Sequence, residues 1–420
     1  MRPVKTRRRC ATTDVEAAIT LAVLVALLIG LAAGKAWERY KLQDGKWIDR
    51  RRARESPHYM LGLNFLVANQ IDRAIEELSR AADVAGDPLE IRLILGNLYR
   101  EKGQVGRAIQ EHQALLQRPS LRKLEHANVL LCLGLDYKHA GFVDRALEAF
   151  TEVLRLDSEN EYALANLEKL YEEQHQWGEA YATRQKLAAR GNAASQPHHQ
   201  EILAFLDNEV GTEALKRMDY AEAARRFRAA TELDPGNAPA YLNLGDVQFL
   251  QGDLAAACSS WEQLVETSPE RAYLAFQRLE AAYAKEGATT RFPDLCRRLI
   301  AANPQDWRAR LALGRHLTVR QRGEDALEPL FDALANNPHA LTVHQAIWQA
   351  LSTLNFPRLL VDRYIDLTRN AVFYLDPHIC TRCRYRSTEL LWQCPHCHDW
   401  NTFVEERMAP AKDSEATLSN

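Results

Sequence analysis

Four cysteines near the carboxyl end of the chain have the spacing of metal ligands. They form two Cys-x-x-Cys pairs, Cys380 with Cys383 and Cys394 with Cys397, and ten residues separate the pairs. The two residues inside each pair let both sulfurs of a tight turn point at one atom, and four thiolates surround a metal ion tetrahedrally at about 2.3 Å. The sequence therefore predicts one metal ion in a four-cysteine site, and both zinc and iron accept such ligands.

The number of protein ligands decides which chemistry this site can support. A catalytic zinc keeps an open position for water, whereas four thiolates fill the tetrahedral shell, so a structural metal is favoured. A dithiol redox pair accounts for one Cys-x-x-Cys but not for two. An iron centre could carry electrons, although the sequence contains no partner cofactor motif. Three histidines are further candidate ligands that we expect to face outward instead: His378, His396 and His398.

A short hairpin is expected to bring the two cysteine pairs together. The stretch "ELLWQ", residues 389–393, is predicted to be its apolar strand. Trp392, Trp400 and Phe403 are expected to cover one side of the metal. A domain of about 30 residues buries too little surface to fold alone, so we expect metal binding to supply much of its stability.

Most of the chain ahead of this domain repeats itself with a period of about 34 residues. "YMLGLNFLVANQIDRAIEELSRAA" from Tyr59 and "LILGNLYREKGQVGRAIQEHQALL" from Leu93 share a Leu-Gly pair, an aromatic residue, a polar turn and an alanine. This pattern predicts tetratricopeptide repeats, which are pairs of antiparallel helices. Eight repeats are predicted, anchored at Ala74, Ala108, Ala146, Ala180, Ala223, Ala257, Phe292 and Ala326.

Other residues of the repeats agree with this interpretation. Small residues such as Gly62, Gly96 and Gly134 let paired helices approach closely, and prolines end the second helix of a pair because proline cannot continue it. The ending prolines are Pro235, Pro269, Pro304 and Pro338. The step between Ala180 and Ala223 is longer than the others and contains "GNAASQPHHQ", residues 191–200, which is predicted to be a loop.

A repeat array of this kind offers a long concave surface for a peptide or protein and no closed pocket for chemistry. His112, His139 and His316 are not part of a constellation of nucleophile and carboxylate in the sequence, so we expect packed or solvated helix residues and no enzyme. Cys132, Cys258 and Cys296 occupy apolar positions of the repeats and are expected to be core residues.

The bulk composition narrows the class of protein. A net charge of −3 with a pI of about 6.5 gives no basic field over the whole chain, which argues against nucleic-acid binding. The cysteines outside the terminal cluster follow no disulfide-like spacing, which is typical of a reducing compartment.

The N-terminal region is predicted to anchor the chain in a membrane. From Ala17 to Gly34 the sequence "AAITLAVLVALLIGLAAG" carries no charge, and a helix of that length spans roughly 27 Å. A buried soluble helix and a cleaved signal peptide are the alternatives. An anchor is favoured because Lys35, Trp37 and Tyr40 follow directly, and the excess of basic residues after the span places the rest of the chain in the cytoplasm.

The order of these parts resembles the lipopolysaccharide assembly protein B (LapB) family of Gram-negative bacteria. The opening repeat "YMLGLNFLVANQIDRAI" and the second repeat are similar to those of the family, and "CTRCRYRSTELLWQCPHCHDWNTF" resembles its rubredoxin-like terminus. The resemblance runs from Ala17 to about Phe403. It identifies the metal ligands as Cys380, Cys383, Cys394 and Cys397.

The resemblance implies a regulatory protein of the bacterial inner membrane. It implies a single-pass anchor with the repeats and the metal domain in the cytoplasm. It further implies an adaptor for the membrane protease FtsH that promotes proteolysis of LpxC, the deacetylase that commits precursors to lipid A. Other lipopolysaccharide assembly proteins are implied partners, and a homodimer stays open. An iron-dependent redox protein and a periplasmic scaffold released by signal cleavage are the alternative functions.

The chain departs from the family pattern in two respects. About fifteen extra residues precede the span, and Arg384 and His398 stand where glycine often follows a cysteine pair, so the knuckles are expected to be strained or reshaped. The expected fold is all-α, a superhelical tetratricopeptide solenoid with an N-terminal transmembrane helix and a small rubredoxin-like domain. Its parts are a basic extension at 1–16, the transmembrane helix at 17–36, a basic linker at 37–57, repeats 1–4 at 58–190, a loop at 191–200, repeats 5–8 with terminal helices at 201–375, the metal-binding domain at 376–407 and a disordered tail at 408–420.

Overall fold

The computed structural model describes residues 56–84, 88–119, 121–190, 196–355, 357–368 and 378–406. The predicted N-terminal extension, transmembrane helix and most of the linker, as well as the tail at 408–420, lie outside the described residues. None of the helices within the described ranges is both long and apolar enough to cross a membrane.

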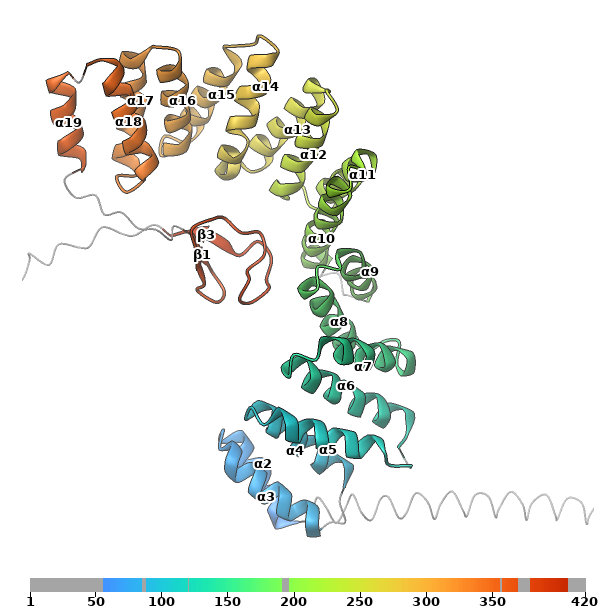
Figure 1. The fold of residues 1–420 in the computed structure, drawn as a ribbon. Helices are drawn as coiled ribbons and strands as arrows, with labels where there is room; N and C mark the ends of the chain where they lie inside the picture. The colour runs from blue at the N-terminus through green and yellow to red at the C-terminus, as the bar shows by residue number, and fades with distance from the viewer. Residues whose placement is uncertain are drawn as a thin grey trace, which may run out of the picture. The chain divides into compact units, whose positions relative to one another are not determined.

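Among the described residues ahead of the metal domain, all regular secondary structure is helical, and the chain divides into two compact units (Figure 1). The first unit ends at Ala163 and contains α2 (Pro57–Val67), α3 (Ile71–Val84), α4 (Leu89–Glu101), α5 (Val105–Leu116), α6 (Lys123–His139) and α7 (Val143–Leu156). The second unit begins at Leu164, within α8 (Glu161–Glu173), and continues with α9 (Trp177–Ala188), α10 (Gln196–Lys216), α11 (Tyr220–Leu233), α12 (Ala238–Leu250), α13 (Leu254–Thr267), the 3-10 helix η1 (Pro269–Leu274), α14 (Phe276–Lys285), α15 (Arg291–Ala302), α16 (Trp307–Val319), α17 (Gly323–Asn336), α18 (Leu341–Thr353) and α19 (Arg358–Thr368).

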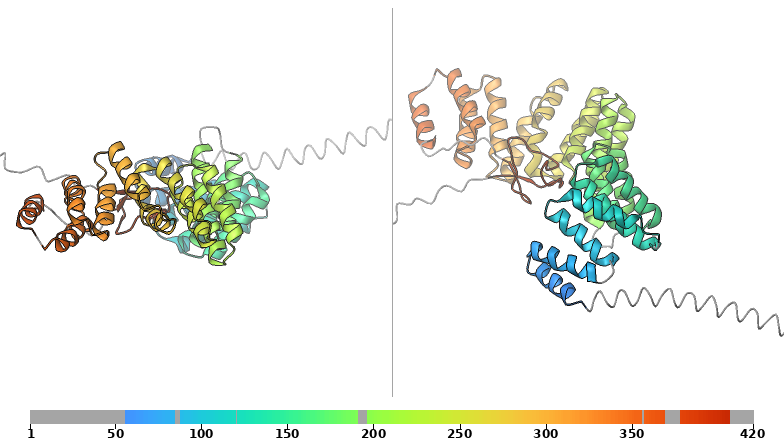
Figure 2. Two further views of the ribbon diagram at one scale, coloured as in Figure 1. Left: turned by 90° about the horizontal axis from the view of Figure 1, so that it is seen from above. Right: turned by 60° about the horizontal axis from the view of Figure 1, so that its bottom comes forward.

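Consecutive helices pack as pairs, as the repeat pattern predicts (Figure 2). The eight anchoring positions are all buried, the least covered being Phe292 at 2% exposure. The four prolines each follow the end of a second helix, for example Pro235 after α11 and Pro338 after α17. The predicted tetratricopeptide array is therefore confirmed.

The loop predicted at 191–200 is partly wrong. Helix α10 begins at Gln196, so residues 196–200 are helical, and residues 191–195 lie outside the described part of the chain. Pro197 favoured a loop in the sequence, but it falls in the first turn of α10, where proline displaces no hydrogen bond within the helix.

Glycine at the contact between paired helices is required by space. A Cβ on Gly245 of α12 would lie 2.3 Å from Nε1 of Trp261 on α13, and Trp261 is 2% exposed. Such overpacking typically costs about 1–3 kcal/mol.

Gly245→Ala is therefore expected to lower the free energy of unfolding by about 1–3 kcal/mol, because Trp261 has no room to move away. The matched control is Gly106→Ala in α5, where a Cβ would meet nothing within 4 Å; it should be neutral or stabilising. Urea unfolding of both variants measures the difference, and equal stability would contradict the close approach.

The metal domain, defined here as residues 378–406, contains a small antiparallel sheet. Its strands are β1 (His378–Cys380), β2 (Arg386–Ser387) and β3 (Phe403–Glu405), in the order β2-β1-β3. Ile379 pairs with Arg386 on one side and with Val404 on the other.

The strand predicted for "ELLWQ" is wrong. In this stretch Gln393 alone forms a bridge, with Trp400, and β2 precedes it. Leu390 and Leu391 both pack against the cysteine cluster, whereas successive residues of a strand point to opposite faces. The segment is therefore irregular because two adjacent leucines serve the same core.

Candidate metal centre

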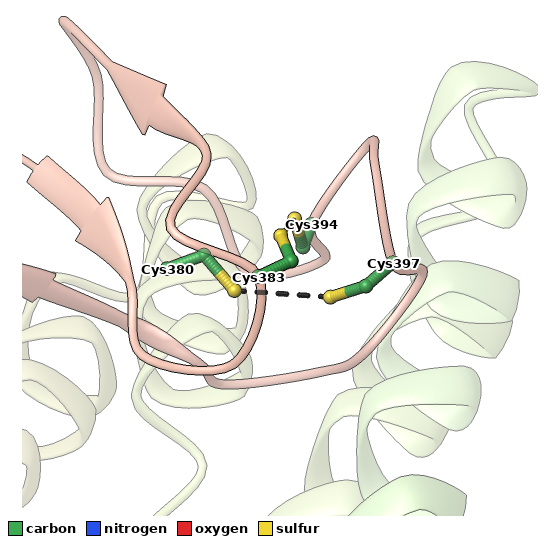
Figure 3. A group of neighbouring side chains, drawn as sticks. All are labelled: Cys380, Cys383, Cys394 and Cys397. Carbon is green, nitrogen blue, oxygen red and sulfur yellow. Dashed lines mark hydrogen bonds between the residues drawn. The ribbon is translucent and has the colours of Figure 1, made fainter.

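The four predicted cysteines converge on one point (Figure 3). Their sulfur atoms all lie within 4.8 Å of one another, with 3.7 Å between Cys380 and Cys397 and 3.5 Å between Cys383 and Cys394. A regular tetrahedron with metal–sulfur bonds of about 2.3 Å has sulfur–sulfur edges of about 3.8 Å. The donor set therefore fits one four-coordinate zinc or iron ion.

The two cysteine pairs are held in equivalent turns. In the first, Arg384 N–H donates to the Cys380 carbonyl at 3.0 Å; in the second, His398 N–H donates to the Cys394 carbonyl at 2.8 Å. Each first cysteine also donates its N–H five residues ahead, from Cys380 to Tyr385 and from Cys394 to Asp399. This repetition of one turn gives the site its approximate twofold arrangement.

Both positions at which the sequence departs from glycine adopt the left-handed conformation. Arg384 has φ of 64° and His398 has φ of 56°. A residue with a Cβ pays roughly 1–2 kcal/mol in this region. The backbone strain expected in the two cysteine turns therefore lies at Arg384 and His398, the residues that follow the second cysteine of each pair.

Arg384→Gly is therefore expected to stabilise the metal domain by about 1 kcal/mol, through relief of this strain. Its matched control is Arg382→Gly, because Arg382 is exposed and is not among the residues with positive φ. Thermal unfolding and resistance to a chelator measure the effect. An equal gain in stability in Arg382→Gly would contradict the assignment of backbone strain to Arg384.

Hydrogen bonds around the sulfurs favour the charged form of one ligand. Burial acts to raise the pKa of Cys380, but the Thr402 hydroxyl, 3.2 Å from Sγ, and the N–H groups of Arg382 and Cys383 lower it to about 6. Burial raises the pKa of Cys383 and Cys397. A cation that replaces the protons is therefore the natural way to hold four sulfurs this close.

The three candidate histidines lie outside the cluster. Among the described residues the group that could hold a metal consists of the four cysteines. His396 is exposed and stacks on Tyr385 at 6.5 Å, as expected for an outward-facing residue. His378 and His398 are half-buried, against the expectation that all three face outward.

The aromatic cover of the metal site differs from the prediction. Phe403 packs against the cysteines as expected, together with Leu390 and Leu391. Trp392 and Trp400 instead pack against the repeats. The expectation that both tryptophans shield the metal is therefore wrong.

Trp400 is the centre of an aromatic contact between the metal domain and the repeats. Its ring stacks on Phe205 of α10, with 5.3 Å between centroids and 18° between planes, and it meets Trp177 of α9 edge-on at 6.2 Å. Trp392 lies 6.3 Å from the same Phe205, and the Arg271 guanidinium lies 5.3 Å above Trp392. Contacts of this type add about 0.5–1.5 kcal/mol each beyond area burial.

Polar contacts surround this aromatic centre on the α8 side. Lys169 Nζ donates to the His398 carbonyl at 3.1 Å, and Gln393 Nε2 donates to Glu172 at 2.8 Å. Glu172 is 2% exposed, so the metal domain supplies hydrogen bonding to a buried carboxylate.

Asn401, next to Trp400 in the chain, makes two further contacts with the repeats. It accepts a hydrogen bond from Arg271 at 2.6 Å and donates to Glu201 at 3.2 Å. The contacts of the metal domain thus come from α8, α9, α10, η1 and α16, the last through an ion pair between Arg308 and Glu405. The domain therefore lies against several helices of the second unit.

The histidines and cysteines that the sequence singled out in the repeats lie in ordinary packed or solvent-exposed positions. His112 is fully buried and lies 2.5 Å from Asp136, and His316 lies 2.6 Å from Glu280, so both contact carboxylates that the sequence did not reveal. His139 is exposed. Cys258 and Cys296 are core residues as predicted, whereas Cys132 is half-buried.

Burial also makes these core thiols unreactive. It raises the pKa of Cys258 to about 11 and that of Cys296 to about 12, which keeps both as thiols at neutral pH.

The sequence missed the repeat residues that hold the metal domain. Trp177, Phe205 and Glu172 resemble ordinary helix residues in the sequence. Their partners are distant, since Glu172 and Gln393 lie 221 positions apart in the sequence, so no local signal could have identified them.

Similar proteins match both parts of the chain. A family model described as a rubredoxin metal binding domain matches residues 378–405, and a tetratricopeptide repeat model matches 59–120, 211–272 and 293–340. Lipopolysaccharide assembly protein B of Escherichia coli (strain K12) is 26% identical over 388 residues, which cover 90% of this chain and 97% of that protein. The protein of the same name from Haemophilus influenzae is 25% identical over 393 residues, with the same coverage.

Solved structures of tetratricopeptide repeat proteins also match part of this chain. The C-terminal part of a TPR repeat-containing protein from Cytophaga hutchinsonii is 13% identical, with a TM-score of 0.40, and covers 69% of this chain and 99% of that one. The matches to relatives and family models confirm the family resemblance drawn from the motifs.

Proposed function

We propose that this chain, a member of the lipopolysaccharide assembly protein B family, is a membrane adaptor that regulates lipopolysaccharide biosynthesis. In this role it binds the deacetylase LpxC and the membrane protease FtsH, and it promotes proteolysis of the deacetylase. The relatives that carry the name of a lipopolysaccharide assembly protein support the pathway, and the resemblance supports the two partners.

The observation that carries the proposal is the metal domain packed against the repeats. Tetratricopeptide arrays bind peptides and proteins along the surface of their stacked helices, and here a metal-pinned module adds a second surface to that face. A saturated shell of four thiolates suits this structural role, because it leaves no open position for a substrate.

The predicted anchor at 17–36 gives the binding surface its place of action. An adaptor held at the membrane meets a membrane protease at a high effective concentration, so weak contacts with a client suffice. The repeats and the metal domain then act in the cytoplasm of the bacterial inner membrane.

Purification of the full-length chain from detergent-extracted membranes tests the proposal. Mass spectrometry of the bound proteins should find FtsH and LpxC, and a homodimer would appear as two differently tagged copies of the chain. Recovery of the chain without either protein, under conditions that retain other membrane complexes, would contradict the adaptor role.

A redox role is the second candidate, and one observation favours it. Cys383 and Cys397 are half-buried, so one edge of the metal site is open to a partner, and solvent-exposed edges help electron exchange in iron–sulfur proteins. Metal analysis with a visible absorption spectrum separates the two candidates, because iron gives charge-transfer bands and zinc gives none.

A further inference from the structure

A cavity of about 990 Å³ lies between the metal domain and the repeats of the second unit. Its helical wall includes Phe276 of α14, Leu311 of α16 and Leu341 of α18, and its other wall includes Leu390 and Glu389 of the metal domain. Ligand pockets in proteins have volumes of about 300–1,000 Å³ and apolar linings with a few polar groups. The cavity has this size and this kind of lining.

The second wall depends on the metal centre. Leu390 lines the cavity and also packs against the cluster of Cys380, Cys394 and Phe403. At the edge of the cavity Glu405 of β3 pairs with Arg308 of α16 at 2.8 Å, and both side chains are about one-fifth exposed. The metal fixes the fold of this wall, and the ion pair fixes its position against α16.

Three carboxylates and two guanidinium groups line the cavity, together with two histidines, His339 and His378. The lining contains the guanidinium groups of Arg308 and Arg315 and the carboxylates of Glu280, Glu389 and Glu405. Arg308 is paired with Glu405, and Arg315 donates to the Thr342 carbonyl at 3.3 Å. Glu280 is about two-fifths exposed beside His316, and Glu389 is exposed.

The occupant that matches these walls is an extended peptide with apolar side chains and at least one lysine or arginine. The apolar side chains would contact Leu311, Leu341 and Leu390, and the cation would lie near Glu389. Apolar burial supplies most of the affinity of such a peptide, and the charges select its sequence.

We propose that this cavity binds an extended, apolar and basic peptide segment of a protein partner, with the metal domain as one wall of the site. The inference rests on the proposed adaptor function and names the chemistry of the segment that the adaptor holds. Because the wall folds around the metal, binding of the segment requires the metal-loaded chain.

Fluorescence anisotropy of the metal-loaded full chain in detergent tests this inference. The probe is the fluorescein-labelled peptide Gly-Lys-Leu-Phe-Leu-Lys-Gly, and its counterpart has glutamate at both lysine positions. The basic peptide should bind more tightly than the acidic one. Ala312→Phe, which fills the cavity, should weaken the basic peptide at least about ten-fold, since a cavity filled by an aromatic ring excludes the peptide side chain.

Charge reversal provides the second test. Glu389→Lys should weaken the basic peptide roughly five-fold, as expected for one exposed ion pair, and strengthen the acidic one. Glu324→Lys is the matched control, because Glu324 is exposed at the start of α17 and does not line the cavity. Removal of the metal with a chelator should abolish binding of the basic peptide, because the wall that the metal domain supplies is lost.

The outcomes separate this inference from the adaptor function. The inference is overturned if neither peptide binds, or if Ala312→Phe and Glu389→Lys leave the affinities unchanged in variants that retain their metal and their circular dichroism. It is also overturned if sedimentation shows that a second copy of the chain fills the cavity. Continued copurification of Ala312→Phe with FtsH and LpxC would reject the cavity as the binding site and leave the adaptor function standing.

Discussion

Cys394→Ser together with Cys397→Ser is expected to release the metal and unfold residues 378–406. The two substitutions remove half of the ligands, and metal binding to a small domain typically contributes about 10–16 kcal/mol to its folding. The remaining core of this domain is small, with Cys380, Cys394 and Phe403 as its buried members. Elemental analysis measures the metal, and limited proteolysis should show cleavage within the metal domain.

The matched control for this experiment is Cys258→Ser. Cys258 is buried in the repeats, far from the cluster in the sequence, and is not a ligand. The control should keep a full complement of metal and an intact metal domain. Retention of the metal by the double variant, or an intact metal domain after the metal is lost, would contradict the four-cysteine site.

Trp400→Ala is expected to detach the metal domain from the repeats while the metal stays bound. The substitution removes the stack on Phe205 and the edge contact with Trp177, and large aromatic truncations at buried sites cost about 3–5 kcal/mol. The four ligands keep their positions, because Trp400 belongs to the cluster of the repeats and not to that of the cysteines. Hydrogen exchange should increase in α10 and in residues 398–402, with unchanged metal content.

Trp348→Ala serves as the control for the loss of a tryptophan. Trp348 lies on α18, is 45% exposed and contacts Tyr364, so its loss should leave the metal domain in place. Metal loss in Trp400→Ala, or unchanged exchange in α10, would contradict the separation between the metal centre and its aromatic contact with the repeats.

The sequence predicted those parts of the structure whose signal is local. The alanines and Phe292 repeat at a period of about 34 residues, and the two Cys-x-x-Cys pairs carry their ligand geometry in their spacing. Arg384 and His398 also stood out, since each replaces a glycine at a position that requires positive φ, and both have it.

The contact between the metal domain and the repeats could not be predicted in this way. Trp392 and Trp400 are apolar residues beside cysteines, and burial against the metal or against Phe205 satisfies the hydrophobic effect equally well. The choice depends on a surface some 200 positions away, as between Glu201 and Asn401. The irregular Leu390–Leu391 segment escaped prediction for a related reason, since an apolar run looks the same whether or not its residues alternate between two faces.

The half-life of LpxC tests the central claim most directly. The host should lack its own lipopolysaccharide assembly protein B, and it should carry this chain, the Cys394→Ser and Cys397→Ser variant, or neither. After translation is blocked, the adaptor function predicts rapid loss of LpxC with the wild-type chain and slow loss without it. The variant should behave like the strain without the chain. An LpxC half-life that does not change when the wild-type chain is present in the membrane would contradict the account.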